Sequence, residues 1–159
     1  PQIHTPDQVR QILEAARLAD PDACRHLAIR YFCGLRTSEA LRLVEDNIRE
    51  RFVEVPGWAS KTRQRRLVEI PENLRAWLAL PGRLPMTNEK RARRIAQVAR
   101  VAWPHNVTRH SWCSYHLALH ESAARTALQA GHSEAMLFRH YRALATPDQA
   151  RAFFQIRPG

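Results

Sequence analysis

The sequence lacks any hydrophobic run long enough to cross a membrane, and no stretch has the pattern of a secretory signal peptide. It contains only three cysteines, Cys24, Cys33 and Cys113, at spacings that do not match a metal-binding pair. An odd number of unpaired cysteines is typical of reduced thiols inside the cell. We therefore expect a cytoplasmic protein without a cysteine metal site.

Acidic residues are also scarce in this chain. Asp and Glu together number 15 against 25 Lys and Arg, which gives a formal net charge of +10. This excess favours a polyanionic partner, DNA or RNA, over a small acidic substrate. A generic basic protein would have the same net charge, so the charge alone does not decide between the two.

The length and the local patterns predict one mostly helical domain over residues 1–159. Thr5-Pro6-Asp7-Gln8 combines an N-cap threonine, a first-turn proline and a capping-box glutamine, and Thr146-Pro147-Asp148-Gln149 repeats this helix start. Asp20-Pro21 starts a second helix, which Gly34 is placed to end. Further helices are expected to begin near Thr37 or Ser38, Pro71, Thr87 or Asn88, Asn106, Ser122 and after His132.

Strand signals are confined to the middle of the chain. Residues 51–56 alternate apolar and charged side chains, and residues 59–61 and 66–70 are predicted to form a hairpin around the polar link 62–65. In the helix expected after residue 88, Ile95, Val98, Ala99 and Ala102 form the predicted core stripe. The expected fold class is therefore α+β, mostly helical, with a small antiparallel sheet.

Several residue types here suit phosphoryl transfer. A tyrosine hydroxyl is a weak nucleophile until neighbouring groups stabilise or accept charge, and arginine offers a planar fork that matches two phosphate oxygens. Two arginines, a lysine, a histidine and a tyrosine would together hold the charge on phosphorus while the tyrosine attacks. The residues in question are Arg36, Lys61, Arg109, His132 and Tyr141.

Three blocks of sequence, in order, resemble the catalytic domain of the tyrosine recombinases, also called phage integrases. CGLRTSEALRL, residues 33–43, resembles the first box of that family, with Arg36 as its arginine and Glu39 as the acidic companion. ASKTRQRRLVEIP, residues 59–71, resembles the β-hairpin segment that carries Lys61. NVTRHS and AGHSEAMLFRHY resemble the second box, with Arg109, His132 and Tyr141 at the usual spacings.

The resemblance implies the fold of that catalytic domain and an enzyme that cleaves and rejoins DNA. Tyr141 would form a 3′-phosphotyrosine, Arg36 and Arg109 would hold the non-bridging oxygens, His132 would assist, and Lys61 would protonate the leaving 5′ oxygen. Glu39 would orient Arg36 or its turn. Neither a metal nor another cofactor is implied. Relatives carry a DNA-clamping core-binding domain before this one, and nothing in residues 1–159 corresponds to it.

The partner implied is double-stranded DNA, which would associate the protein with the nucleoid. The full-length protein would act as a homotetramer on DNA, whereas the isolated domain is expected to be a monomer. Backbone contacts are expected from five basic side chains, and a solvated charged surface is the alternative for each. These residues are Arg63, Arg65, Lys90, Arg93 and Arg94.

One position departs from the family pattern. The family often has histidine three residues before the second arginine, and here that position is Asn106. Asparagine can donate a hydrogen bond but cannot shuttle a proton, so proton removal from Tyr141 would pass to His132 or to water. Asn106 is equally suited to be a helix N-cap. His110 is expected to bridge parts of the structure rather than to catalyse.

Three alternatives remain open from the sequence. The first is a DNA-binding module of the same fold that has lost catalysis, and the second is a relaxing type IB topoisomerase with the same chemistry. The third is a metal-dependent hydrolase that uses His116 and His120, which stand four residues apart beside Glu121. The resemblance also implies a C-terminal tail that docks on a neighbouring protomer, so the final helix with Phe153 and Phe154 is expected to present exposed aromatics as an assembly surface.

Overall fold

The computed structural model describes residues 1–59 and 63–159. Its first two helices begin where the sequence predicts. Helix α1, Pro6–Ala19, has the full capping box of Thr5 and Gln8, and α2, Pro21–Cys33, is capped by the Asp20 side chain. Gly34 ends α2 in the left-handed conformation, with φ of 65°. Each helix begins after a residue whose side chain accepts a hydrogen bond from a backbone N–H of the first turn. The glycine accounts for the carboxyl end of α2.

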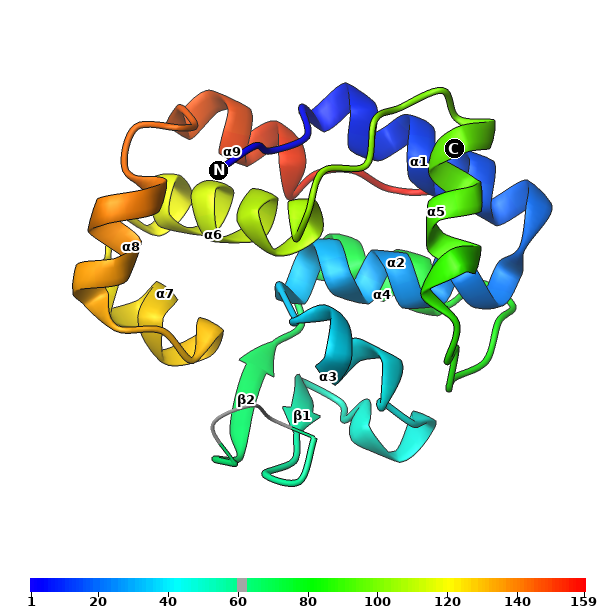
Figure 1. The fold of residues 1–159 in the computed structure, drawn as a ribbon, viewed down its shortest axis with the longest axis horizontal. Helices are drawn as coiled ribbons and strands as arrows, with labels where there is room; N and C mark the ends of the chain where they lie inside the picture. Colours follow the sequence, from blue (N-terminus) through cyan, green and yellow to red (C-terminus); the bar gives the residue numbers. More distant parts are fainter. Residues whose placement is uncertain (60–62) are drawn as a thin grey trace.

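Helix α2 lies at the centre of the molecule (Figure 1). It packs against α1, the following helix α3, Thr37–Leu41, and three later helices. These are α4, Glu72–Leu78, α5, Glu89–Val98, and α6, Val107–His120. Leu27 and Phe32 are fully buried among them, so α2 is the element on which the rest of the chain is assembled.

A small sheet lies on one side of α2, next to α3 (Figure 1). A 3₁₀ turn, Glu45–Asn47, leads to β1, Phe52–Val55, which pairs antiparallel with β2, Arg66–Glu69, with Phe52 opposite Glu69. The α+β class with a small antiparallel sheet is thus confirmed.

The predicted partner of the second strand was wrong within the described residues, because β2 pairs with residues 52–55. Ala59 lies in a turn closed by its N–H to Pro56 O, and Ser60, Lys61 and Thr62 lie outside the described residues. The apolar alternation of residues 52–55 gives β2 a partner whose Val53 and Val55 are fully buried.

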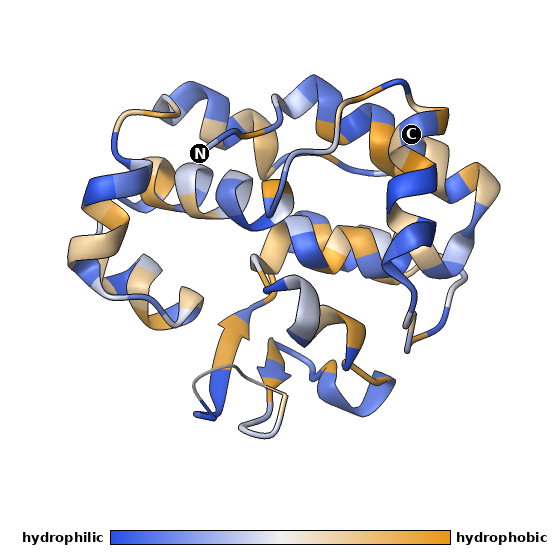
Figure 2. Ribbon diagram, viewed as in Figure 1, coloured by the Kyte–Doolittle hydropathy of each residue, from blue (hydrophilic) through white to orange (hydrophobic). Residues whose placement is uncertain are grey.

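Helix α5 buries a different stripe from the one predicted. Ala92, Ile95 and Ala96 are buried, whereas Val98 is 58 % exposed and Ala102 is exposed. The helix ends at Val98, so the residues after it no longer follow the 3.6-residue period on which the prediction depended. Figure 2 shows α5 as hydrophilic over much of its length, as expected for a helix that packs with one narrow face.

The C-terminal part of the chain folds back over α6. Helices α7, Ala123–Ala130, and α8, Glu134–Tyr141, lead to α9, Pro147–Phe153, which packs on α6. Phe153 is fully buried and stacks on Tyr115 with ring centroids 4.4 Å apart. The expectation that Phe153 and Phe154 are exposed for assembly was therefore wrong, since Phe153 lies in the core of its own chain and Phe154 is partly buried against it.

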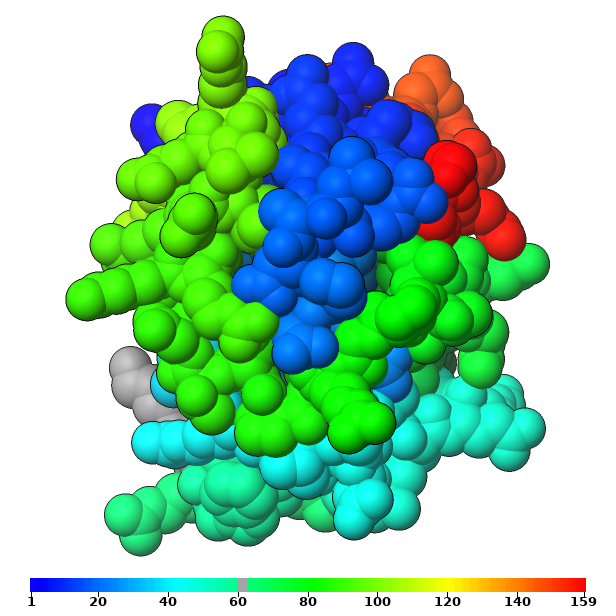
Figure 3. Space-filling model, turned by 90° about the vertical axis from the view of Figure 1, so that its right-hand side faces the viewer, coloured from blue at the N-terminus to red at the C-terminus, as the bar shows by residue number. Residues whose placement is uncertain are grey.

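The segment after α9 is held by side chains of the amino-terminal half. Asn73 Nδ2 and Trp77 Nε1 both donate to Ile156 O, and the N–H of Gly159 donates to Glu14 Oε1 on α1. Figure 3 shows this carboxyl-terminal segment, in red, against the blue surface of α1 and α2.

The cysteines Cys24, Cys33 and Cys113 are buried free thiols. Within the described residues, no helix is both long and apolar enough to cross a membrane.

We predict that Gly34→Ala destabilises the fold strongly. A Cβ at Gly34 would lie 2.4 Å from the Trp112 ring, and an L-residue is strained at this φ. Gly131→Ala is the matched control, because Gly131 also ends a helix at positive φ but its Cβ would meet only Arg66 atoms at 3.4 Å or more. Urea unfolding should show Gly34→Ala losing about 1–3 kcal/mol more than Gly131→Ala. Equal losses would show that the Trp112 contact does not constrain this position.

Candidate active site

An open cleft of about 1030 Å³ lies between α3, the start of α6, the α7–α8 connection and α8. Five residues singled out from the sequence line it together with Asn106, although they come from distant parts of the chain. They are Arg36, Arg109, His110, His132 and Tyr141. Pro1 also lines this cleft.

Arg36 enters the cleft from the turn between α2 and α3. It is the N-cap residue of α3 with no side-chain cap bond, so the predicted cap by Thr37 or Ser38 was wrong. Thr37 Oγ1 instead accepts a hydrogen bond from the buried Arg30. Glu39 takes over the capping role, since its Oε1 accepts the Arg36 backbone N–H at 2.9 Å. The turn that carries Arg36 is therefore held by a carboxylate.

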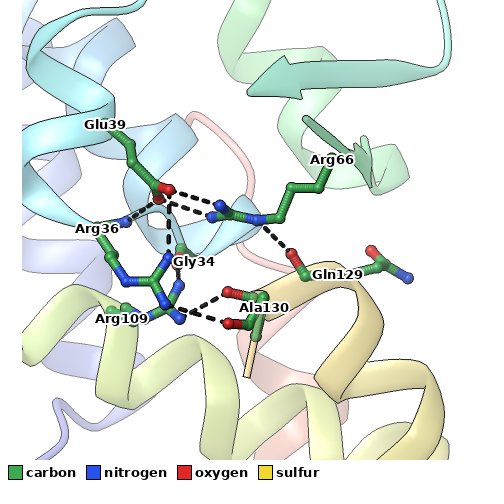
Figure 4. A network of polar contacts seen from close by, with 8 residues as sticks. Gly34, Arg36, Glu39, Arg66, Arg109, Gln129 and Ala130 are labelled. Atoms are coloured by element: carbon green, nitrogen blue, oxygen red, sulfur yellow. Dashed lines mark hydrogen bonds and ion pairs between the residues drawn. The ribbon is translucent and has the colours of Figure 1, made fainter. Parts of the chain in front are cut away.

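Glu39 is fully buried and makes its shortest contacts with Arg66, the first residue of β2 (Figure 4). Arg66 Nη1 and Nη2 lie 2.5 and 2.7 Å from the two Glu39 oxygens, whereas Arg36 Nη1 lies 3.3 Å from Oε2. Burial raises the pKa of the carboxyl, but the hydrogen bonds and charges of Arg66 and Arg36 together outweigh burial, and the pKa lies below its usual range. Glu39 is therefore ionised at neutral pH.

The carboxyl end of α7 is held by three arginines from three other parts of the chain (Figure 4). Arg66 Nε donates to Gln129 O at 2.9 Å, Arg109 Nη2 to Ala130 O at 2.6 Å, and Arg36 Nη2 to Gly131 O at 3.2 Å. The last carbonyls of a helix have no partners within the helix and form its negative end, so cations are favourable there.

Arg109 lies in the first turn of α6 and is buried, with 4 % of its surface exposed. Its second fixed contact is Nη1 to Gly34 O at 2.8 Å. Burial, with smaller contributions from Arg36 and Arg66, lowers the pKa of Arg109 to about 10, so it stays charged at neutral pH. A buried guanidinium held by two carbonyls is preorganised toward an anion in the cleft.

Tyr141, the last residue of α8, is almost buried, and its hydroxyl lies 2.8 Å from His110 Nδ1. Burial is the main reason why the pKa of Tyr141 is raised above its usual value, although Arg109 and Arg36 act to lower it. Burial also lowers the pKa of His110 to about 4, so its ring is neutral at pH 7. In the tautomer protonated at Nε2, His110 accepts the hydrogen bond of the phenol.

His132 follows Gly131, which ends α7 at φ of 70°. Its Nε2 is buried and has no hydrogen-bond partner among the described residues. Burial and the nearby arginines lower the pKa of His132 to about 4. A buried ring nitrogen without a partner, next to three guanidinium groups, is suited to contact an oxygen of a bound anion.

Asn106 stands at the N-cap position of α6, but its side chain makes no cap bond. Its backbone is left-handed, with φ of 54°, and its Nδ2 lies 3.1 Å from His105 Nε2. The predicted N-cap role is therefore right in position and wrong in mechanism. Asn106 is among the residues that line the cleft.

The remaining basic residues predicted to bind DNA are at the surface. Arg63, Lys90, Arg93 and Arg94 are exposed, and Arg65 is exposed with its Nε on Glu54. Lys61 lies outside the described residues.

His116 Nδ1 contacts Thr126 Oγ1, and its ring stacks on Trp112. Within the described residues, no group of three or more His, Cys, Asp or Glu side chains is arranged to hold a metal ion.

Two contacts of the site were missed from the sequence. Arg66 was placed at the start of the predicted strand 66–70 and given no role in the site, yet its side chain is only 9 % exposed and pairs with Glu39. The strand period could have indicated this, because Arg66 shares a face with the buried Val68 and Ile70. His110 was expected to have a structural role, and its contact with Tyr141 joins residues that no local pattern relates.

We predict that the free energy of unfolding falls as the pH drops from 6.5 toward 4. His110 and His132 each have a folded-state pKa of about 4 against an ordinary pKa of 6.5, so the unfolded chain binds more protons in this window. Stability from these groups is complete above pH 6.5 and is lost on acidification. An NMR titration of the two rings, with urea unfolding at each pH, measures both effects. Rings that titrate above pH 6 would contradict the predicted burial of these sites.

No protein-family model matches the chain. Among curated proteins, the Holliday junction branch migration complex subunit RuvA of Pseudomonas paraeruginosa is 35 % identical over 66 residues, which is 42 % of this chain and 33 % of that protein. RuvA of Pseudomonas putida is 33 % identical over 84 residues, or 48 % of this chain and 41 % of that one. The chain thus spans only about a third of the first of these relatives.

The similarity to solved structures extends over most of the chain. The catalytic domain of bacteriophage HP1 integrase has a TM-score of 0.71 and 20 % identity, covering 87 % of this chain and 85 % of that one. XerA recombinase has a TM-score of 0.73 and 18 % identity over 100 % of this chain and 66 % of that one. XerH recombinase bound to its difH substrate has a TM-score of 0.68 and 17 % identity over 99 % and 55 %. The chain therefore has the fold of a tyrosine recombinase catalytic domain, as the sequence resemblance implies.

Proposed function

We propose that this chain cleaves and rejoins DNA strands through a 3′-phosphotyrosine intermediate, as a site-specific recombinase or integrase. The observation that carries the proposal is that Arg36, Arg109, His132 and Tyr141 line one cleft. The similar structures include a recombinase bound to a DNA substrate, and the RuvA relatives are named for a DNA junction, which supports DNA as the partner.

The charge balance of the site favours a phosphodiester. Arg36, Arg66 and Arg109 carry three positive charges, and Glu39 is the carboxylate that faces them in this network. Two charges are therefore not neutralised by the network. Guanidinium groups fixed before the substrate arrives stabilise charge that develops on the phosphoryl oxygens without having to reorganise. The arginines would thus supply the electrostatic stabilisation that the reaction requires.

In the proposed reaction, one bond to phosphorus forms as another one breaks. The Tyr141 oxygen attacks phosphorus, the bond from phosphorus to the 5′ oxygen breaks, and the strand is left attached to Tyr141 through its 3′ phosphate. Lys61 would give a proton to the departing 5′ oxygen. Rejoining is the reverse, with the 5′ hydroxyl as nucleophile. The covalent bond conserves the energy of the phosphodiester, so the chemistry requires no nucleotide cofactor and no metal.

The proton of Tyr141 has two candidate acceptors. His110 Nδ1 is 2.8 Å from the hydroxyl, within reach for general base catalysis. Its ring is neutral at pH 7, but its lowered pKa makes it a weaker base than an ordinary histidine, so the assignment rests on the distance. The ring centroids of His132 and Tyr141 are 6.3 Å apart, and the orphaned Nε2 of His132 suits a phosphate oxygen. We therefore assign the proton to His110 and phosphate binding to His132, with Asn106 as a further donor.

A second candidate function is DNA binding without catalysis. Asn106 in place of histidine favours it, as does a Tyr141 hydroxyl that is buried with a raised pKa. A relaxing topoisomerase would share the covalent step and differ in its product. If the protein is a recombinase, we propose that the full-length protein acts as a tetramer on DNA.

We predict that wild-type protein forms a covalent adduct with nicked duplex DNA and that Tyr141→Phe does not. Because the target site is unknown, the substrate is a pool of nicked duplexes with randomised sequence, and adducts are isolated under denaturing conditions with EDTA present. Tyr115→Phe is the matched control, since the Tyr115 hydroxyl donates to His4 O outside the cleft. Adduct from Tyr141→Phe would remove the nucleophile assignment. A wild type that binds DNA without forming adduct would favour the non-catalytic module.

We also predict that DNA affinity depends on salt through the exposed face of α5. Lys90, Arg93 and Arg94 are exposed on this helix, and removal of each phosphate contact should reduce the slope of log K against log salt by about 0.9. Titrations of the single variants Lys90→Gln, Arg93→Gln and Arg94→Gln measure this. Arg157→Gln serves as control, because Arg157 pairs with Glu72 on α4. Unchanged slopes in all three variants would mean that α5 is only a solvated face.

A further inference from the structure

We propose that Arg66 is a positioning residue for the reaction, which acts by occupying Glu39 so that the Arg36 guanidinium stays available to a phosphate. This inference rests on the proposed function of the cleft. Arg66 is not among the residues that line the cleft, so its effect would pass through Glu39 and the end of α7.

The contacts of Glu39 are strongly unequal. Arg66 engages both carboxylate oxygens, at 2.5 and 2.7 Å, in the side-by-side geometry that suits a guanidinium and a carboxylate. Arg36 Nη1 makes one longer contact, at 3.3 Å, so most of its guanidinium is not committed to Glu39. The side chain of Arg66 is 9 % exposed and that of Glu39 fully buried, so solvent screens the pair little.

Arg66 also supports the segment that carries His132. Its Nε donates to Gln129 O, and its side-chain atoms lie against Gly131, where a Cβ would meet them at 3.4–3.5 Å. The same strand contacts α7 again through the Glu69 N–H, which donates to Gln129 Oε1 at 3.1 Å. Arg36 and Arg109 bind the next two carbonyls, so one short backbone segment fixes the relative positions of all three guanidinium groups.

Loss of Arg66 would leave Glu39 as a buried carboxylate whose cationic partner in the network is Arg36. Coulomb attraction in a poorly solvated site is strong, so Glu39 would draw Arg36 from its single long contact into a close pair. Arg36 would then have fewer donors and less net charge for a phosphate. The defect of an Arg66 variant should thus depend on the negative charge of Glu39. If the role of Arg66 were purely structural, the defect would not depend on that charge.

The experiment compares Arg66→Met, Arg66→Lys, Glu39→Gln and the double variant Arg66→Met/Glu39→Gln, each checked for folding by circular dichroism. Arg49→Met is the matched control, because Arg49 is an exposed arginine that pairs with Glu54 and does not line the cleft. Two quantities are measured: the rate of covalent adduct formation on the nicked pool, and the affinity for inorganic phosphate, followed through the Nε–H signals of Arg36 and Arg109 by NMR.

We expect Arg66→Met to lower both quantities by about tenfold or more, Arg66→Lys to lie between Arg66→Met and wild type, and Arg49→Met to match wild type. The double variant should recover much of the phosphate affinity, because Glu39→Gln removes the negative charge that competes for Arg36. A folded Arg66→Met with wild-type affinity for phosphate, or a double variant no better than Arg66→Met, would overturn the proposal.

The phosphate titration separates this inference from the proposed function. If wild type forms no adduct but the variants show the expected order of phosphate affinities, DNA cleavage is wrong and the role of Arg66 stands. If Arg66→Met does not fold, the phosphate affinities of Arg66→Lys and of the double variant are compared with that of wild type instead. Arg66→Lys with wild-type phosphate affinity would then overturn the proposal, since lysine cannot reproduce the bidentate contact with Glu39.

Discussion

The ionised carboxylate of Glu39, buried without direct access to water, is the constraint on which the candidate site depends. It receives two N–H groups from Arg66 and a backbone N–H from Arg36, so it joins β2 to the turn before α3. Removal of one partner from such a pair typically costs about 3–5 kcal/mol, because the remaining charge stays buried. The position of Arg36 therefore depends on a residue of the sheet.

The carbonyls at the end of α7 neutralise the charge of the three arginines only in part. Its last carbonyls carry part of a negative charge, and each is satisfied by a different arginine without cancelling a full unit of charge. Carbonyl partners thus orient guanidinium groups but leave them electropositive, whereas carboxylate partners would have neutralised them. The short α7–α8 connection also carries His132, so the scaffold that orients the arginines orients the histidine as well.

The parts that could be predicted from sequence are those governed by local chemistry or by the resemblance. The capping box of Thr5 and the glycine end at Gly34 follow from neighbouring residues. The family blocks also selected Arg36, Arg109, His132 and Tyr141, which line one cleft, while their catalytic roles stay a prediction. The contact of Arg66 with Glu39 spans 27 positions and that of His110 with Tyr141 spans 31. Such pairs arise from tertiary packing, which periodicity and spacing do not encode.

Pro1 and Gly159 differ in what surrounds them. Pro1 is among the residues that line the cleft, whereas Gly159 is bound to Glu14 and Arg17 on α1. An affinity tag fused directly before Pro1 would thus emerge beside the guanidinium groups, and an acidic or histidine-rich tag would compete there for the same charges. Recombinant protein for binding studies is accordingly better tagged after Gly159, away from the arginines whose affinity is to be measured.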